Sequence, residues 1–176
     1  LARVSVAGVP LDSTWASPER LAQHGQQLLE RCRDLLDLRA ADLLRATVAE
    51  LPGLFADRAA VFAHGDFCPV NVLVEPRPAS LDEQPGAAPL KVLGLLDLEF
   101  ARVADPLFDA AWWGWVVRYH HAERWVVAWP ALLAAAGIPN DAATAARIQA
   151  LQRLRCLEMI ARQLHGHTPS VPTSWL

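Results

Sequence analysis

The sequence has few residues of several reactive kinds, and each shortage narrows the class of protein. It contains one lysine, Lys91, and its three cysteines, Cys32, Cys68 and Cys156, lie far apart with no C-x-x-C pair. An odd number of widely separated cysteines does not suggest a disulfide framework. We therefore expect free thiols, as in proteins of a reducing compartment.

Long apolar runs and an excess of charge of one sign are also missing. No segment reaches the ~18 uninterrupted apolar residues of a membrane span, and the first residues do not combine a basic region with an apolar signal core. A net charge of -3 and a pI near 6.1 give no basic stripe for a nucleic acid polymer. With 53% hydrophobic residues in 176, the chain can bury a substantial core, so we expect one cytoplasmic globular domain that binds neither membranes nor nucleic acid polymers.

A polar loop between apolar segments carries the chemistry: His64-Gly65-Asp66-Phe67-Cys68-Pro69-Val70-Asn71, followed further on by Leu93-Gly94-Leu95-Leu96-Asp97. An Asp with an Asn five residues later, then a second Asp at the end of an apolar strand, is the spacing of a phosphoryl-transfer site. Such a site holds divalent cations against phosphates and orients the attacking hydroxyl. Asn71 and Asp97 suit Mg²⁺, which takes few oxygen ligands from protein, and Asp66 suits the base that accepts the hydroxyl proton.

Together with Asp105-Pro106-Leu107-Phe108-Asp109-Ala110-Ala111, these motifs resemble the aminoglycoside phosphotransferase family, whose fold is like that of protein kinases. The resemblance runs through roughly residues 62 to 112. It implies that Asp66 is the catalytic base and that His64 supports the catalytic loop. It implies that Asn71 and Asp97 bind Mg²⁺ and, with it, the nucleotide. It further implies that Asp109 braces the loop from a helix start and that Asp105 is a structural residue of the turn before it.

Two positions depart from the pattern of related proteins. Leu98-Glu99 follows Asp97 where a protein kinase has Phe-Gly, and Ala104 precedes Asp105 where the family often has Gly. The second departure leaves the shape of that turn open.

The resemblance implies an α+β, mainly helical fold: the C-terminal lobe of the protein kinase-like fold, with a small β-hairpin carrying the catalytic and metal-binding loops. Residues 1–14 would be the hinge segment from a missing N-terminal lobe, because a short apolar strand leads into Gly8-Val9-Pro10-Leu11. Residues 15–176 would be the C-terminal lobe. Lys91 stands just before the Asp97 strand and is wrongly placed to pair with phosphates. We therefore expect either one lobe of a longer protein or a natural half-kinase.

Periodicity and capping signals predict the remaining elements. Ser17-Pro18 is a helix start, with Ser at the N-cap and Pro at the first helical position. The expected helices are residues 18–36, a second helix through Leu43 and Leu51 that stops at Pro52-Gly53, helical sequence from Pro106 onward, and a last helix over 142–164 that follows the capping residue Asp141. The expected strands are 61–63, 70–75 and 91–96, with a mobile proline-rich hairpin loop over 76–89. The two strands beside that loop would pair and present Asn71 and Asp97 to one cleft.

Aromatic residues and histidines are the other side chains that could serve a site. Trp112, Trp113, Trp115, Tyr119, Trp125 and Trp129 gather on the helical sequence after the motifs. We expect Trp112 and Trp125 to belong to the core, whereas some of the others could line an acceptor pocket. His24 is interpreted as a surface residue, His120 and His121 as a poor metal pair on different helix faces, and residues 165–167 as part of an irregular tail.

The sequence thus predicts an ATP- or GTP-dependent phosphotransferase that uses Mg²⁺ to move the γ-phosphate to a hydroxyl group of a small molecule, and that is inactive as the isolated fragment. Residues 112–176 contain only Glu123, Asp141 and Glu158 as acids, which favours a neutral or anionic acceptor over a polycationic aminoglycoside. Two alternatives stay open. One is a non-catalytic, pseudokinase-like binding module; the other is an interaction domain whose Trp-rich face meets a partner or a second copy, with self-association of the isolated lobe.

Overall fold

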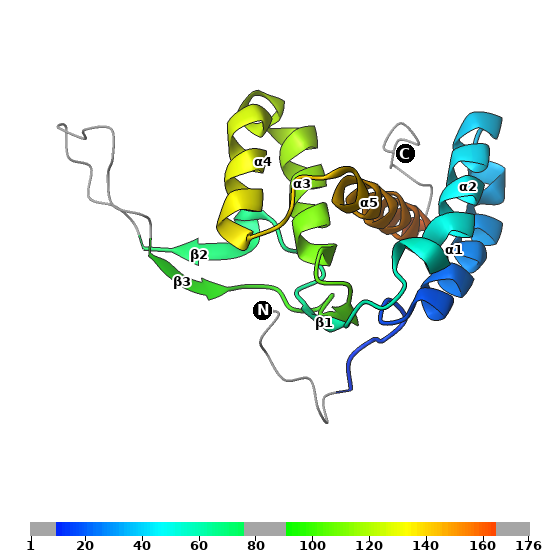
Figure 1. Cartoon of the computed structure of the whole chain (residues 1–176), viewed down its shortest axis with the longest axis horizontal. Coiled ribbons are helices and arrows are strands. Elements are labelled where there is room, and N and C mark those ends of the chain that lie inside the picture. The colour runs from blue at the N-terminus through cyan, green and yellow to red at the C-terminus, as the bar shows by residue number, and fades with distance from the viewer. Residues whose placement is uncertain (1–9, 76–90, 165–176) are drawn as a thin grey trace.

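Helices form most of the computed structural model, which describes residues 10–75 and 91–164 (Figure 1). Two helices pack side by side at one end of the molecule, two more pack together nearer the other end, and the longest helix lies between these pairs. The helices are α1 (Pro18–Cys32), α2 (Leu38–Leu54), α3 (Phe108–His120), α4 (Ala122–Ala136) and α5 (Ala142–Gln163), with short 3₁₀ helices η1 (Arg33–Leu35) and η2 (Pro69–Asn71). The predicted mainly helical α+β fold is confirmed.

Helix α5 organises the core because it is buried along most of its length and packs against α1, α2 and α3. Leu151 and Leu154 join a cluster with the start of α3, and Leu157 joins a second cluster with Leu28 of α1 and Leu44 of α2. Each such buried leucine contributes roughly 1.5–3 kcal/mol relative to an exposed one. The apolar stripes predicted from helical periodicity are therefore what holds these helices together.

A glycine lets α3 and α4 approach each other closely. A Cβ atom on Gly114 of α3 would lie 2.6 Å from the six-membered ring of Trp129 of α4. Because that distance is shorter than real Cβ contacts allow, the ring occupies the space that a side chain at residue 114 would fill. This contact explains a glycine in the interior of a helix, where it otherwise costs roughly 1 kcal/mol relative to alanine.

Two small antiparallel strand pairs frame the polar loop. β1 (Val61–Ala63) pairs with β4 (Arg102–Ala104), and β2 (Val72–Val74) pairs with β3 (Val92–Leu95), Val72 lying opposite Leu95. The β2–β3 ribbon reaches out past α4 in Figure 1. The predicted pairing of β2 with β3, the two strands on either side of residues 76–89, is thus confirmed. The chain before α1 also joins the first pair, since Asp12 bridges Arg102 in parallel.

Several predicted boundaries shift, each for a local reason. Both predicted caps are present: the Ser17 hydroxyl accepts the Arg20 N–H at 3.3 Å, and the Asp141 carboxylate accepts the Thr144 N–H at 2.7 Å. α2 does not stop at Pro52. Proline removes one hydrogen bond, but the Phe55 N–H still donates to the Leu51 carbonyl and carries the helix on to Leu54.

Two other boundaries differ because turns replace part of an expected element. Residues 69–71 form the 3₁₀ helix η2, so β2 begins at Val72 rather than at Val70. The expected helix over 18–36 ends at Cys32, and η1 takes its last turn. A third segment, β4, lies in sequence that carried no strand prediction.

Three side-chain expectations have different outcomes. Trp112 is buried, as predicted, whereas Trp125 is only half-buried and lines a groove of about 160 Å³ between α3, α4 and α5. His24 is half-buried and not a plain surface residue, because its ring packs edge-on against Trp15 at 5.7 Å between centroids. That burial lowers the pKa of His24.

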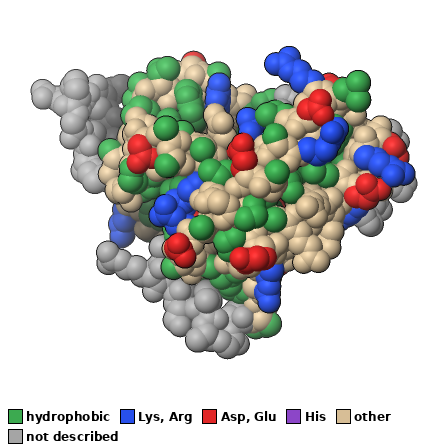
Figure 2. All heavy atoms as spheres, turned by 45° about the vertical axis from the view of Figure 1, so that its right-hand side comes forward, with side chains coloured by type: hydrophobic (Ala, Val, Ile, Leu, Met, Phe, Trp, Pro, Cys, Tyr) green, Lys and Arg blue, Asp and Glu red, His purple; other side chains and the backbone are tan. Residues whose placement is uncertain are grey.

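On the face shown in Figure 2, acidic and basic side chains are interspersed with hydrophobic ones. All three cysteines are buried free thiols. Across residues 10–75 and 91–164, no helix has the length and apolar character needed to cross a bilayer. The expected strand before Gly8, the loop 76–89 and the tail with residues 165–167 lie outside the described residues.

Candidate active site

His64 anchors the polar loop at the end of β1. Its side chain is fully buried, and its ring nitrogen Nε2 lies 2.8 Å from the Leu96 carbonyl oxygen. The backbone N–H of Asp66 donates to Nδ1 at 3.3 Å. Since Nδ1 is an acceptor here, the ring proton belongs on Nε2, where it donates to Leu96. The imidazole therefore ties the loop to the end of β3.

Asp109, in the first turn of α3, binds the backbone of the same loop. Its two carboxylate oxygens accept the backbone N–H groups of His64 and Gly65 at 2.9 and 3.0 Å. Burial raises the pKa of Asp109, although the two amide donors act in the opposite direction. One side chain thus satisfies two successive amides and fixes the direction in which the loop leaves β1.

Asp66 lies at the tip of the loop with a donor on each carboxylate oxygen. The indole Nε1–H of Trp112 donates to Oδ1 at 2.6 Å, and the Asn71 Nδ2 group donates to Oδ2 at 3.2 Å. The same Nδ2 group donates to the Asp66 backbone carbonyl at 2.9 Å. The Asp and Asn that the sequence separates by five positions are therefore in direct contact.

The β2–β3 ribbon brings Leu96, the residue before Asp97, against the backbone of Asn71. The Leu96 N–H donates to the Asn71 carbonyl at 2.9 Å, one step beyond the Val72–Leu95 pair. Asp97 then takes a left-handed backbone conformation with φ 61° and an exposed side chain. Such a conformation costs a non-glycine residue roughly 1–3 kcal/mol and is concentrated at functional sites. The left-handed conformation at Asp97, the candidate metal ligand, comes two residues after the end of β3.

The donor chemistry at Asn71 and Asp97 fits a hard divalent cation. Asn71 uses its nitrogen to bind Asp66, so its Oδ1 oxygen is the atom available for a metal. The exposed Asp97 carboxylate supplies negative charge and oxygen ligands, which Mg²⁺ prefers. A pair of protein ligands is the number expected when phosphates and waters complete the shell. Within the described ranges, no group of three or more His, Cys, Asp or Glu side chains forms a separate metal cluster.

Asp105 does not face this loop; it fixes the turn that leads into α3. One carboxylate oxygen accepts the Leu107 N–H at 2.8 Å, and the other pairs with Arg147 of α5. Both side chains are almost completely buried. A buried carboxylate that is paired and capped in this way sets the geometry of a turn.

A buried charged cluster behind the loop was not predicted. Glu158 of α5 lies 3.2 Å from an Arg102 nitrogen and 2.5 Å from an Arg155 nitrogen. Burial raises the pKa of Glu158, but the two guanidinium groups outweigh it and hold that pKa below its usual value. The signal in the sequence was the presence of Arg155 and Glu158 within the apolar pattern of α5, where charged residues are expected only if paired.

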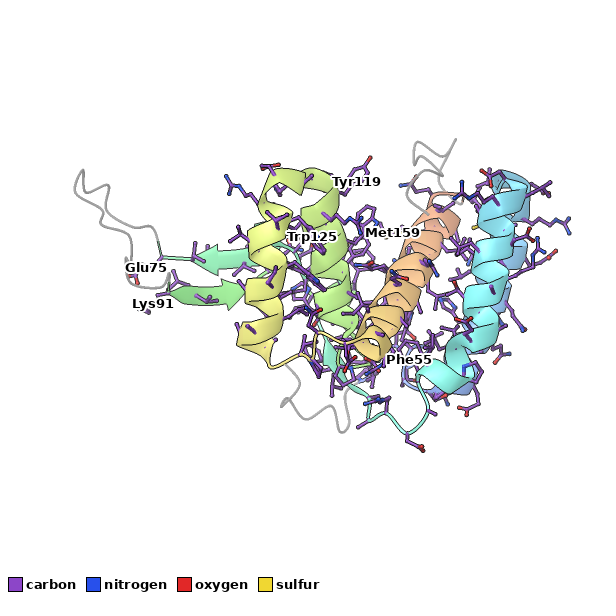
Figure 3. The ribbon with its side chains drawn as sticks, turned by 45° about the horizontal axis from the view of Figure 1, so that its top comes forward. Phe55, Glu75, Lys91, Tyr119, Trp125 and Met159 are labelled. Atoms are coloured by element: carbon purple, nitrogen blue, oxygen red, sulfur yellow. The ribbon has the colours of Figure 1, made fainter. Side chains whose placement is uncertain are left out.

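The single lysine lies far along the ribbon from the loop. Figure 3 shows Glu75 and Lys91 together at the outer ends of β2 and β3. Their side chains are 3.6 Å apart, and the Glu75 N–H donates to the Lys91 carbonyl at 2.9 Å. Lys91 therefore ends the ribbon beside an exposed acid.

Comparison with known proteins identifies a family and a solved structure with a similar fold. Residues 3–151 match the model of the phosphotransferase enzyme family. The aminoglycoside phosphotransferase APH(3'')-Id from Streptomyces rimosus has a similar fold, with a TM-score of 0.58 and 21% sequence identity. The match covers 88% of this chain and 57% of that one, so the chain spans little more than half the length of the solved protein. Among curated proteins there is no match.

Proposed function

The chain belongs to the phosphotransferase enzyme family, and from that premise we propose that it is the C-terminal lobe of an enzyme that transfers the γ-phosphate of ATP or GTP to a hydroxyl group of a small molecule. Residues 15–176 form that lobe in this proposal, and residues 1–14 lead from the lobe that covers the nucleotide. The complete protein carries the activity, and the isolated lobe is inactive.

The observation that carries the proposal is the contact of Asp66 with Asn71, together with the backbone hydrogen bond from Leu96, the residue before Asp97, to the Asn71 carbonyl. Phosphoryl transfer needs a group that orients the attacking hydroxyl and ligands that hold Mg²⁺ beside it. These three polar side chains come from two segments that meet at one end of the β2–β3 ribbon. This arrangement is better explained by one shared role of the three residues than by three separate structural roles.

Each residue has a distinct task in the proposed reaction. Asp66 accepts a hydrogen bond from the acceptor hydroxyl and takes its proton as the hydroxyl oxygen bonds to the γ-phosphorus and the bond from that phosphorus to the departing nucleoside diphosphate breaks. Asn71 and Asp97 hold Mg²⁺, which neutralises the developing charge on the phosphate oxygens when it is bound. His64 and Asp109 keep the loop in place through the Leu96 carbonyl and the two loop amides. Asp105 keeps the start of α3 in place through Arg147.

The acidic residues on α3, α4 and α5 are engaged in other contacts, which favours a neutral or anionic acceptor over a polycationic one. Asp109 accepts the loop amides, Asp141 caps α5, and Glu158 is buried between arginines. The remaining acid, Glu123, lies exposed beside Arg124 at the start of α4. A polycationic acceptor would need several carboxylates facing it. On these three helices, the acids are already engaged in other contacts.

The first experiment is Mg²⁺-dependent turnover of ATP or GTP by the full-length gene product. The acceptor panel should contain neutral alcohols and sugars, hydroxy acids and aminoglycosides. We expect product with a neutral or anionic acceptor and its loss in Asp66→Ala. Phosphorylation of aminoglycosides alone would overturn the acceptor class but not the reaction. A full-length protein that binds no nucleotide and shows no turnover would instead favour the pseudokinase-like binding module.

A further inference from the structure

Trp112 connects the buried charged cluster behind the loop to Asp66. We propose that Trp112 is a positioning residue for the proposed reaction: its indole N–H holds the Asp66 carboxylate in the orientation that accepts the substrate hydroxyl. The proposal rests on the catalytic role of Asp66 given above. It assigns to a core tryptophan a task that neither the sequence motifs nor the family match identifies.

The hydrogen bond itself is short, and its donor is buried while the Asp66 carboxylate is half-buried. Trp112 Nε1 lies 2.6 Å from Asp66 Oδ1, and the Trp112 side chain is only 7% exposed. A hydrogen bond to a charged acceptor is stronger than one between neutral groups, and exclusion of water strengthens it further. A core tryptophan usually needs some partner for its N–H. Here the partner is the proposed base and not a backbone carbonyl.

The direction of the indole N–H is fixed by what packs on the ring. The Trp115 ring stacks on Trp112 in parallel, with centroids 5.0 Å apart, and Tyr119 continues the stack at 5.2 Å. The Arg155 guanidinium also packs over the Trp112 ring, 5.2 Å from its centroid. Figure 3 places Tyr119 at the far end of α3. An indole held by a ring stack and a cation cannot rotate without breaking several contacts.

Arg155 is itself immobilised from two directions. It pairs with Glu158 at 2.5 Å, and its guanidinium also lies 4.8 Å from the centroid of Phe100. Phe100 in turn contacts the catalytic loop, since its backbone carbonyl lies directly against Gly65. Arg155 therefore supports the loop through its contact with Phe100, and it supports Asp66 through its contact with Trp112. This gives the buried arginine a reason to lie beside aromatic rings close to the site.

The two donors together determine which part of the carboxylate is left for the substrate. Trp112 binds Oδ1 and Asn71 binds Oδ2, so the plane of the Asp66 carboxylate is set by donors on both sides. If the Trp112 donor is removed, Asn71 alone leaves the carboxylate free to turn. Misorientation of a reacting group lowers the rate of the chemical step more than it weakens binding of the nucleotide.

Trp112→Phe tests the proposal because it keeps an aromatic ring in the stack and under Arg155 but removes the N–H. In the full-length gene product we expect kcat to fall roughly 10- to 100-fold, the magnitude of one lost hydrogen bond to a charged group. KM for the nucleotide should change less than about twofold, since the contact is made to the base and not to the nucleotide. Trp113→Phe, the same change one residue along the helix, is the matched control and should retain the wild-type kcat.

A spectroscopic measurement tests the contact without turnover. In the ¹⁵N-labelled chain, the indole N–H signal of Trp112, identified by its loss in Trp112→Phe, should lie downfield of the other tryptophans. Asp66→Ala should move it upfield, while Asp97→Ala should leave it nearly unchanged. If the chemical shift of the Trp112 indole N–H does not change in Asp66→Ala, the proposal is overturned, even if Trp112→Phe proves too unstable for kinetics.

The outcomes separate this proposal from the proposed function. Normal kcat in a folded Trp112→Phe variant would show that Trp112 is a packing residue only, and phosphoryl transfer would stand. Equal loss in Trp113→Phe would also overturn the positioning role, because it would trace the defect to packing of α3. Absence of turnover in the wild-type full-length protein would overturn the proposed function, and the catalytic meaning of the Trp112 contact with it.

Discussion

Gly65 lies against Phe100 so closely that a Cβ atom on residue 65 would stand 1.9 Å from the Phe100 carbonyl oxygen. Gly65 also has φ 83°, in the left-handed region that glycine adopts at no steric cost. The loop between β1 and η2 therefore requires glycine at this position for two independent reasons. The glycine of the His-Gly-Asp motif is thus required by packing and by backbone conformation.

Gly65→Ala should accordingly destabilise the fold. The strained backbone costs about 1–3 kcal/mol and the clash with a backbone atom a similar amount, so we expect a loss of about 2–6 kcal/mol. Urea unfolding of the chain measures it. Gly94→Ala is the control, because a Cβ there meets no atom within 4 Å, and it should change the free energy of unfolding by less than about 1 kcal/mol. Equal effects at the two positions would contradict the account of Gly65.

Glu158→Gln should be destabilising at neutral pH and less so in acid. Removing the charge leaves Arg102 and Arg155 buried without a counter-ion, which costs about 3–5 kcal/mol. Because the folded-state pKa of Glu158 lies below the ordinary value of 4.5, the stability that its charge contributes is fully present above pH 4.5 and is lost as the pH falls through the lowered pKa. Urea unfolding at pH 7 and at successively lower pH values should show the wild type and the variant converging.

The control for that measurement is Glu123→Gln, at an exposed acid whose partner Arg124 lies 3.7 Å away. Its free energy of unfolding should match the wild type at each pH. A difference between wild type and Glu158→Gln that stays constant with pH would show that the loss comes from packing and not from charge.

The Asp105–Arg147 pair should show strong energetic coupling. Arg147→Met leaves Asp105 buried without its cation and should cost about 3–5 kcal/mol, and Asp105→Asn keeps the oxygen that caps Leu107 but removes the charge. In a double-mutant cycle we expect a coupling energy of at least about 1 kcal/mol. The same cycle on the exposed Asp42–Arg45 pair should give about 0–0.5 kcal/mol. Additive effects of the two buried substitutions would mean that each residue stabilises the turn independently.

Asp97→Asn should weaken the use of Mg²⁺ by the full-length protein. We expect the Mg²⁺ concentration for half-maximal turnover to rise at least roughly 10- to 100-fold, since loss of even an indirect metal partner has effects of that size. Glu99→Gln, at an exposed acid two residues along the chain, is the control and should leave the Mg²⁺ dependence unchanged. Turnover that persists after chelation of divalent ions would rule out the metal-binding role of Asp97.

Local sequence was sufficient to predict the polar loop at residues 64–71 and the strands that follow it, because the information there is local. Asp66 and Asn71 lie five positions apart on one loop, and the short apolar runs that precede Asp97 and follow Asn71 predict the strands that pair. The helices followed from apolar spacing and from the caps at Ser17 and Asp141. The β4 strand was missed because it is only three residues long and begins with a charged residue, Arg102, whereas the equally short β1 is wholly apolar.

Long-range partners could not be found from spacing at all. Arg102 and Glu158 are 56 positions apart, and Trp112 and Asp66 are 46 apart. The sequence marked Trp112 as core and showed arginines on α5, but propensity and periodicity do not say which buried charge pairs with which. Trp125 was wrongly expected in the core, since size and hydrophobicity do not tell whether the next helix covers a ring.

By itself, the sequence determined the order of the polar residues on the loop, the apolar stripes of the helices and the likeness to a phosphotransferase. Those features depend on residue type and on short separations along the chain. Only the tertiary structure decided that Asp109 receives both loop amides, that Phe100 lies over Gly65 and that Trp112 donates to Asp66. These contacts arise because packing of α3 and α5 brings distant segments to within hydrogen-bond reach, and the geometry of that packing depends on many side chains at once.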